Sequence, residues 1–272
     1  NNPLTVLWRD EHLVAVHKPA GWLVHRTGLD AGETRFALQM LRDQLGQAVW
    51  PAHRLDKGTS GVLLFALSAE VARLLGQAFE SGDGLQKTYR AVVRGWPSDE
   101  GLIDHPLKRM PDDMRTERLE VQPAQSRFAT LRRFELPLPQ QGFASTRCAE
   151  VALQPLTGRR HQLRRHMKHI AHPIIGDATY GKGRHNRLFQ QLFGCHRMLL
   201  ACTRLALAHP LTNTALEIVA PPAQDFATVA CALGWDAVLA SAAAQADTFG
   251  AQSPFPVFRR LDAANDPTRL SR

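Results

Sequence analysis

The chain has 272 residues, of which 44% are hydrophobic and 21% charged, so a disordered protein is excluded and one large folded domain is allowed. Its 33 basic and 25 acidic residues give a net charge of +8. No uncharged apolar run approaches the ~20 residues of a membrane span, and charged residues at 9–11 stand where a signal peptide would need an apolar core. Four cysteines without C-x-x-C spacing favour reduced thiols over a zinc ribbon or a disulfide scaffold. We expect a cytoplasmic protein.

Positive charge is concentrated in one window of the chain. Between Glu150 and Glu217 the only acid is Asp177. The basic residues of this window are Arg159, Arg160, Arg164, Arg165, Lys168, Lys182, Arg184, Arg187, Arg197 and Arg204. Ten bases and one acid leave a local charge of +9, whereas a solvated charged surface normally mixes both signs. The window therefore indicates a polyanionic partner.

Apolar periodicity and turn residues predict the secondary structure in chain order. Two short strands are expected within 5–21, and a helix over 36–45 should end at Gly46. A buried strand over 61–68 is followed by a helix that Ser68 caps and Gly82 ends. Further strands are predicted within 87–96, 146–156 and 198–210, and further helices within 158–172 and 223–235.

Two segments show weaker patterns. Residues 97–145 are rich in proline and charge, which favours irregular hairpins and loops, and residues 246–272 form a loosely ordered tail in this prediction. Because strands and helices mix without strict β-α-β alternation, the predicted class is α+β. We expect a single domain over residues 1–245.

The stretch GDATYGKG, residues 176–183, matches the first seven positions of a nucleotide-binding P-loop. Gly183 takes the place of the Ser or Thr that binds magnesium, and residues 184–187 are not expected to begin an apolar helix. A turn with close backbone approach is the better interpretation, so no nucleotide cofactor is predicted.

His166, His169 and His172 form an H-x-x-H-x-x-H ladder that could suggest a metal site. No carboxylate lies nearby in sequence, and the neighbouring Arg and Lys side chains would repel a cation. We predict no metal there, and expect contact with RNA phosphate or packing in the core.

A lone carboxylate, Asp56, lies in AHRLDKGTSGVLLFALS, residues 52–68, where a basic, turn-rich octet leads into an apolar strand. Asp56 could close the turn by accepting backbone N–H bonds near Thr59. The basic window elsewhere in the chain favours a second interpretation, an ionised carboxylate that acts on a polyanion and that a basic partner keeps ionised despite burial.

Four stretches, in this order, resemble the RluA family of pseudouridine synthases. They are HKPAGWLVH (17–25), HRLDKGTSG (53–61), KTYRAVVRG (87–95) and TGRRHQLRRHMKHIAHPIIGDATYG (157–181). The resemblance covers roughly residues 4–236. It implies a mixed, mostly antiparallel central sheet flanked by helices and loops, an active-site cleft across the sheet, and isomerisation of uridine without cofactor or metal.

The resemblance also implies roles for individual residues. Asp56 would be the catalytic aspartate, and Arg164 would pair with it. Tyr89 would stack on the flipped base and act in proton transfer, Leu163 would wall the pocket, and Arg54 would enter the RNA helix where the uridine has left. The remaining residues expected to bind RNA are Arg159, Arg160, Arg165 and Lys168.

Two further stretches, WLVHRTGLD and LRDQLGQAVWPAHRLD, resemble the tRNA-directed branch of the family. That branch modifies uridine 65 in the TΨC stem, so the resemblance implies a tRNA substrate, no N-terminal S4-type domain and no obligate protein partner. One departure is visible, because Leu200-Ala201-Cys202 stands where relatives usually carry Leu-His-Ala. Three alternatives stay open: a 23S rRNA stem-loop substrate, a non-catalytic RNA-binding protein and, more remotely, a metal-dependent nuclease.

Overall fold

The computed structural model describes residues 3–25, 34–82, 84–110, 120–139 and 142–233. Its strands are β1 (Thr5–Arg9), β2 (Leu13–Lys18), β3 (Trp50–Pro51), β4 (Ser60–Ala66), β5 (Gln86–Arg94), β6 (Glu100–Asp104), β7 (Leu107–Lys108), β8 (Val121–Gln122), β9 (Gln125–Leu136), β10 (Thr146–Pro155), β11 (Leu200–Ala208) and β12 (Ala215–Val219). Its helices are α1 (Ala37–Leu45), α2 (Ala69–Ser81), α3 (Gln162–His169), α4 (Gly183–Phe193) and α5 (Gln224–Ala232). The predicted tail, 246–272, lies outside the described residues.

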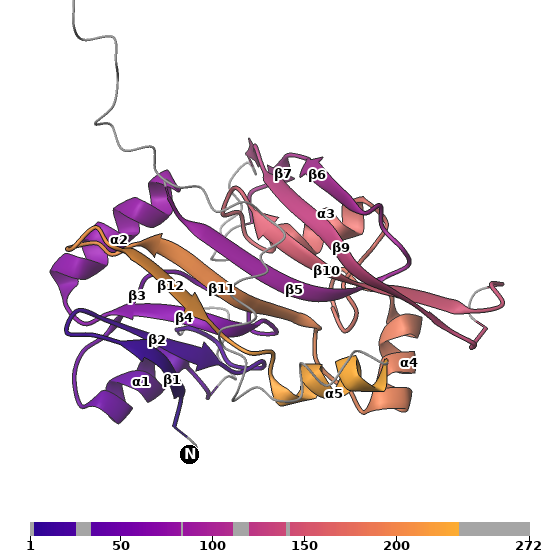
Figure 1. Ribbon diagram of the computed structural model, residues 1–272, viewed down its shortest axis with the longest axis horizontal. Helices are drawn as coiled ribbons and strands as arrows, with labels where there is room; N and C mark the ends of the chain where they lie inside the picture. The colour runs from indigo at the N-terminus through magenta and orange to yellow at the C-terminus, as the bar shows by residue number, and fades with distance from the viewer. Residues whose placement is uncertain (1–2, 26–33, 83, 111–119, 140–141, 234–272) are drawn as a thin grey trace, which may run out of the picture.

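One large mixed sheet forms the centre of the molecule (Figure 1). Its strand order is β1-β2-β4-β11-β5-β10-β9-β6, with β12 paired to β11 and β3 paired to β4. The β4–β11 pair is parallel and the other named pairs are antiparallel. The predicted α+β class with a mostly antiparallel sheet is confirmed.

Two hydrophobic clusters hold the helices against the sheet. The larger one joins the central strands to α1 and α2 through residues such as Leu41, Phe65 and Leu75. The smaller one packs Phe189 of α4 and Phe226 of α5 together, at the end of the sheet opposite α1 and α2 (Figure 1). Burial of this apolar area is the main stabilising contribution to the fold.

Helix α2 begins and ends at the predicted residues. The hydroxyl of Ser68 accepts the backbone N–H of Val71, which satisfies one of the free donors of the first turn. Gly82 ends the helix in the left-handed conformation, with φ of 72°. Gly46 ends α1 in the same way, with φ of 66°. Both stop signals were therefore correctly predicted from the sequence.

Irregular hairpins and loops inserted into the sheet were predicted over 97–145, and the described part of this segment contains antiparallel strand pairs that are more regular than expected. Strand β9 has 12 residues and pairs with β10 along its length, from Ser126↔Pro155 to Leu136↔Thr146. Only its first half alternates, with Ser126 and Phe128 buried, and its second half is half-buried or exposed. The run LRRFEL in that second half does not alternate strictly between apolar and polar residues, so the period-2 signal is lost and pairing with β10 decides its structure.

Helix α4 was also missed, because residues 184–187 were not expected to begin an apolar helix. Gly183 opens this helix, which buries His185 and Phe189 one turn apart. Helix α3 begins only at Gln162, although the predicted helix began at 158. His161 precedes α3 in the left-handed conformation, with φ of 55°, so the helix cannot extend further toward the N-terminus.

Gly61 allows the parallel pairing of β4 with β11. Its φ is +112°, and a Cβ atom there would lie 2.0 Å from the backbone oxygen of Cys202. A side chain cannot occupy that space, so only glycine lets the two strands pair at this point. The turn that precedes Gly61 and carries Asp56 is thereby fixed to the centre of the sheet.

Candidate active site

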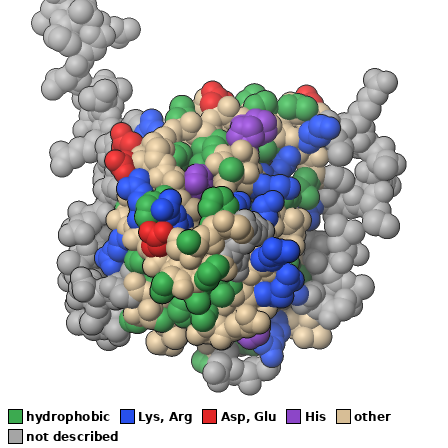
Figure 2. Space-filling view, turned by 90° about the vertical axis from the view of Figure 1, so that its right-hand side faces the viewer, with side chains coloured by type: hydrophobic (Ala, Val, Ile, Leu, Met, Phe, Trp, Pro, Cys, Tyr) green, Lys and Arg blue, Asp and Glu red, His purple; other side chains and the backbone are tan. Residues whose placement is uncertain are grey.

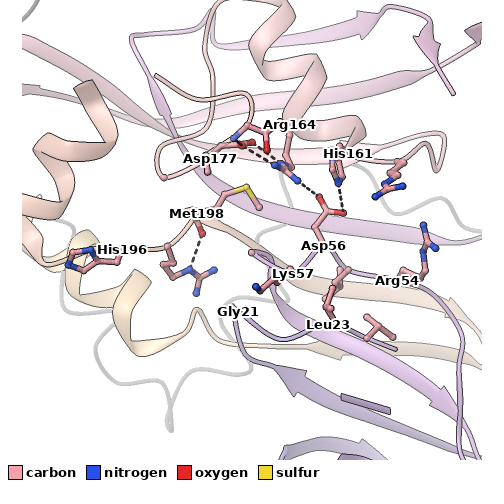
Figure 3. A pocket seen from close by; sticks show the side chains of 18 of the residues that line it. Gly21, Leu23, Arg54, Asp56, Lys57, His161, Arg164, Asp177, His196 and Met198 are labelled. Atoms are coloured by element: carbon pink, nitrogen blue, oxygen red, sulfur yellow. Dashed lines mark hydrogen bonds and ion pairs between the residues drawn. The ribbon is translucent and has the colours of Figure 1, made fainter. Parts of the chain in front are cut away.

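Asp56 lies in the turn between β3 and β4. The backbone carbonyl of Asp56 accepts the N–H of Thr59 at 3.0 Å, so the main chain closes this turn. The carboxylate points instead toward α3, where Nη1 of Arg164 donates to Oδ2 at 3.1 Å (Figure 3). Of the two interpretations left open by the sequence, this geometry favours a carboxylate presented to a basic partner.

Arg164 connects two carboxylates. Its Nε donates to Oδ2 of Asp177 at 2.7 Å and its Nη2 donates to Oδ1 at 2.9 Å, which leaves Nη1 for Asp56. Backbone N–H groups of Thr179 and Tyr180 also donate to Oδ1 of Asp177. Such a planar two-bond pair fixes the guanidinium in one orientation.

The charges of this pair stabilise one another. Burial by itself raises the pKa of Asp177, but Arg164 and the backbone donors more than offset that effect and lower it. Burial lowers the pKa of Arg164, and its bonds to Asp177 and Asp56 raise it further than burial lowers it. Asp177 was not predicted to be a site residue, although it is the only acid of the basic window.

His161 faces the other oxygen of Asp56. Its Nε2 lies 3.9 Å from Oδ1 of Asp56, and its Nδ1 lies 3.1 Å from the hydroxyl of Tyr180. Burial lowers the pKa of His161, while the nearby Asp56 opposes that change. A histidine in the left-handed conformation is uncommon, and here it aims the ring at the carboxylate (Figure 3).

Asp56 lines two adjoining cavities. The larger has a volume of about 630 Å³ and extends from Arg54 and Asp56 to His196 (Figure 3). The smaller has about 110 Å³ and is lined by Tyr89 and Leu163. Asp56, Arg164 and His161 line both, so they stand where the two cavities meet. A cleft with a small inner pocket is typical of a site that takes up one group of a larger ligand.

Tyr89 projects from β5 into the inner pocket. Its side chain is buried, and burial raises the pKa of its hydroxyl well above the usual value, with Cys202 and Asp56 adding to the effect. The hydroxyl therefore stays protonated near neutral pH. Cys202 is paired with Tyr89 across β11 and β5, so the sequence departure at 200–202 places a thiol beside the tyrosine.

The other residues expected to bind RNA divide into two groups. Arg160 lines the larger cavity, Arg159 and Leu163 line the inner pocket, and Arg54 lines both. Arg165 and Lys168 are outside both linings: Arg165 donates to the backbone oxygen of Lys108, and the ammonium of Lys168 lies 5.7 Å from the ring centre of Tyr180.

In the structure, the basic residues between Glu150 and Glu217 include some that form ion pairs and others that are exposed. Three of its arginines form internal ion pairs: Arg164 with Asp56 and Asp177, Arg197 with Asp225, and Arg204 with Glu217. Four basic residues are exposed, namely Lys168, Lys182, Arg184 and Arg187. On the face at the α4 end of the molecule, Lys and Arg side chains are spread over the surface and acidic ones are sparse (Figure 2).

Lys18 is a site residue that the sequence reasoning missed. Its side chain is fully buried, and its Nζ donates to the backbone oxygens of Pro19 at 2.9 Å, Trp22 at 2.7 Å and Lys57 at 3.4 Å. Burial lowers the pKa of Lys18 to about 7, with Arg197 adding to the effect. The lysine thus ties the turn after β2 to the turn that carries Asp56, and its only sequence signal was its place in HKPAG.

The histidine ladder serves packing in the structure. His166 is fully buried and bonds to the hydroxyl of Ser126 and the backbone oxygen of His105. His169 stacks on His105, and His172 bonds to the backbone oxygen of Arg94. No group of three potential metal ligands occurs within the described ranges. Nor does any helix in them have the length and apolarity to cross a membrane.

Comparison with known proteins identifies the family. Residues 12–169 match the family model described as RNA pseudouridylate synthase. The chain is 46% identical to tRNA pseudouridine synthase C of Yersinia pestis, over 86% of this chain and 93% of that protein. It is 45% identical to tRNA pseudouridine synthase C of Vibrio cholerae, over 85% and 96%.

Solved structures agree. Human RNA Pseudouridylate Synthase Domain Containing 4 superposes with a TM-score of 0.62 at 26% identity, over 85% of this chain and 93% of that chain. The human Domain Containing 1 protein gives a TM-score of 0.61 at 25% identity, over 80% and 83%. The chain therefore belongs to the RNA pseudouridylate synthase family, as the motifs predicted. It is an isomerase that converts uridine in RNA to pseudouridine.

Proposed function

We propose that this enzyme isomerises a uridine in the TΨC stem of tRNA, at position 65, with Asp56 as its catalytic residue. The observation that carries the catalytic part is the Asp56–Arg164 ion pair at the junction of the two cavities. The tRNA substrate is supported by relatives named tRNA pseudouridine synthase C that match over most of their length.

The reaction breaks the N1–C1′ bond, turns the base and forms a C5–C1′ bond. A proton leaves C5 and N1 gains one, so atoms and charge balance without a redox partner. Both addition of the carboxylate to C1′ and removal of the C2′ proton need an ionised aspartate beside the ribose. Arg164 compensates the charge of Asp56, and Asp177 prevents the guanidinium from turning away.

A base within a stem has to leave the helix before Asp56 can reach its sugar, which costs a few kcal/mol. The inner pocket, about 110 Å³ in volume, is lined by Tyr89 and Leu163, and the ring of Tyr89 offers the extruded base a stacking surface. In this proposal Arg54, which is exposed and lines the cleft, occupies the gap that the base leaves in the RNA helix. Basic residues around the cleft offset part of the cost by binding phosphate.

Pseudouridine mapping tests the proposal. Unmodified tRNA and 23S rRNA transcripts are treated with the enzyme or with Asp56→Asn, and pseudouridine is located by carbodiimide adducts and primer extension. We expect one stop in the TΨC stem that disappears with Asp56→Asn. A stop confined to rRNA would refute the tRNA substrate, and turnover by Asp56→Asn would refute the catalytic aspartate.

The proposal treats residues 1–245 as one catalytic domain, without cofactor, metal or obligate protein partner. It places the enzyme in the cytoplasm, where tRNA is its substrate. Arg159, Arg160, Arg165 and Lys168 bind RNA backbone in this proposal, with Arg159 and Arg160 at the cleft itself.

A further inference from the structure

His161 has no assigned part in the reaction, yet it lies against Asp56 in both cavities. Its Nε2 is 3.9 Å from Oδ1 of Asp56, which is too far for a direct hydrogen bond. Oδ2 of the same carboxylate is occupied by Arg164. The gap between Nε2 and Oδ1 therefore lies on the side of Asp56 that remains open to a ligand.

The surroundings of His161 determine which of its nitrogens carries the proton. The hydroxyl of Tyr180 lies 3.1 Å from Nδ1 and 3.5 Å from the sulfur of Met110. A proton on Nε2 points at the negative charge of Asp56, whereas the other tautomer would turn a lone pair toward that charge, so Nδ1 is the acceptor of the Tyr180 hydroxyl. The proton of the neutral ring is then on Nε2, where it faces the negative charge of Asp56.

Nε2–H and Oδ1 thus form a donor and an acceptor separated by 3.9 Å. One oxygen atom can lie about 2.8 Å from both at once, because two such lengths together exceed that separation. The group that fits must accept from Nε2–H and donate to Oδ1 through the same oxygen. A hydroxyl does both, whereas a phosphate or a carbonyl oxygen only accepts.

We propose that His161 and Asp56 together bind the ribose 2′-hydroxyl of the target nucleotide, which makes His161 a determinant of ribose over deoxyribose. The inference rests on the proposed function, since an Asp56 that acts at C1′ or C2′ lies beside the 2′-hydroxyl. The 2′-hydroxyl is the group by which a protein distinguishes RNA from DNA at one position. The left-handed backbone conformation at His161 directs the ring toward Asp56, as binding of the 2′-hydroxyl between the two side chains requires.

The experiment compares two substrates that differ in one atom. A tRNA is assembled by ligation with either uridine or 2′-deoxyuridine at the target position, and single-turnover rates and RNA affinity are measured. The variants are His161→Asn and His161→Gln. Asparagine tolerates the left-handed conformation but is too short to reach Oδ1, and glutamine restores a donor near the position of Nε2.

We expect the wild-type enzyme to prefer uridine over 2′-deoxyuridine by about tenfold or more, as the loss of a hydrogen bond to a charged group predicts. His161→Asn reduces that preference at least about threefold, mainly by lowering the single-turnover rate with the uridine substrate. His161→Gln restores part of the preference. His12→Ala, which removes a histidine distant from both cavities, keeps the wild-type preference. Intrinsic differences in sugar reactivity affect all variants equally and cancel in the comparison.

An equal preference in wild type and His161→Asn, with intact folding by circular dichroism, would overturn the inference. A wild-type enzyme that modifies the uridine substrate would still support the proposed function in that case. Absence of product from the uridine substrate would reject the proposed function, and this inference with it. The two failures are thus distinguished by the uridine reaction of the wild type.

Discussion

Arg164 and Asp177 form a two-bond ion pair, with Nε–Oδ2 at 2.7 Å and Nη2–Oδ1 at 2.9 Å, that aims the third guanidinium nitrogen at Asp56. The side chain of Asp177 is fully buried, whereas 27% of the Asp56 side chain is exposed. One acid thus anchors the arginine, and the other is left to face the cleft. The orientation of the Asp56 carboxylate thus depends on a residue that does not line the inner pocket.

Replacing Asp177 by asparagine should release this anchor. We expect kcat to fall by about 10- to 100-fold, because a displacement of about 1 Å near the reacting atoms has an effect of that size. The free energy of unfolding should also fall, on the order of 3 kcal/mol, since a buried pair loses one partner. Single-turnover kinetics and urea unfolding measure the two effects. Asp225→Asn, which breaks the more exposed pair with Arg197, is the control, and an equal loss in both variants would argue against a positioning role.

Arg164→Lys should impair turnover although it preserves the charge. A lysine cannot make the planar two-bond contact with Asp177 and still donate to Asp56 in a fixed direction. We expect kcat to decrease about tenfold or more, with RNA affinity changed less than about threefold. Arg42→Lys, at a surface pair with Asp43, serves as the control. Wild-type turnover by Arg164→Lys would contradict the ion-pair hypothesis.

Tyr89 is expected to act through both its ring and its hydroxyl. Tyr89→Phe keeps the stacking surface but removes the proton that burial retains on the hydroxyl, so kcat should fall while RNA affinity is kept. Tyr89→Leu loses the ring as well, and stacking is worth about 1–3 kcal/mol per base. Measured kcat and Kd for the two variants separate these contributions. Equal Kd and kcat in Phe and Leu variants would show that the ring does not stack.

The basic cleft predicts a change in the salt dependence of RNA binding. Arg159→Gln and Arg160→Gln should each lower the slope of log Kd against log salt by about 0.9, as expected for one phosphate contact on a duplex, and the double variant should lower it by about twice as much. The loss should be similar for unrelated RNA duplexes, because phosphate contacts carry no sequence information. Arg73→Gln, on the surface of α2, is the matched control. An unchanged slope in the double variant would place the phosphate contacts elsewhere.

His166 predicts a loss of stability in mild acid. Burial lowers the pKa of His166, whose neutral ring bonds to Ser126 and to the backbone oxygen of His105. Below pH 6.5 the unfolded chain therefore binds a proton that the native state does not, and stability decreases as pH falls. One such proton contributes at most about 1.4 kcal/mol per pH unit.

Urea unfolding at pH 7.5 and 5.5 measures this contribution. His166→Gln should be less stable at pH 7.5 but lose less stability on acidification than the wild type. The comparison isolates His166 from other buried histidines, because those are present in both proteins. The same loss on acidification in both proteins would show that His166 titrates as it does in the unfolded chain.

Much of the local structure could be predicted from the sequence. Helix α2 begins after Ser68 and ends before Gly82, because a hydroxyl cap and a left-handed glycine act on the residues next to them. The motif around Asp56 also predicted Arg164 as its partner, 108 residues away, but only through resemblance to a family. Periodicity failed at β9, where pairing with β10 decides the strand. Helix α4 was missed although Leu188, Phe189, Leu192 and Phe193 have helical spacing.

Which basic residues between Glu150 and Glu217 are exposed follows from the fold and cannot be predicted from the sequence pattern. Arg164, Arg197 and Arg204 look like surface bases in the sequence, but each guanidinium is largely buried and paired with an acid. The same holds for the ion pair of Asp177 with Arg164 and for the approach of His161 to Asp56. Both require that α3 and the loop after it lie against the turn that carries Asp56. Sequence patterns report interactions within a few residues, whereas ion pairs between distant segments exist only once the sheet has brought those segments together.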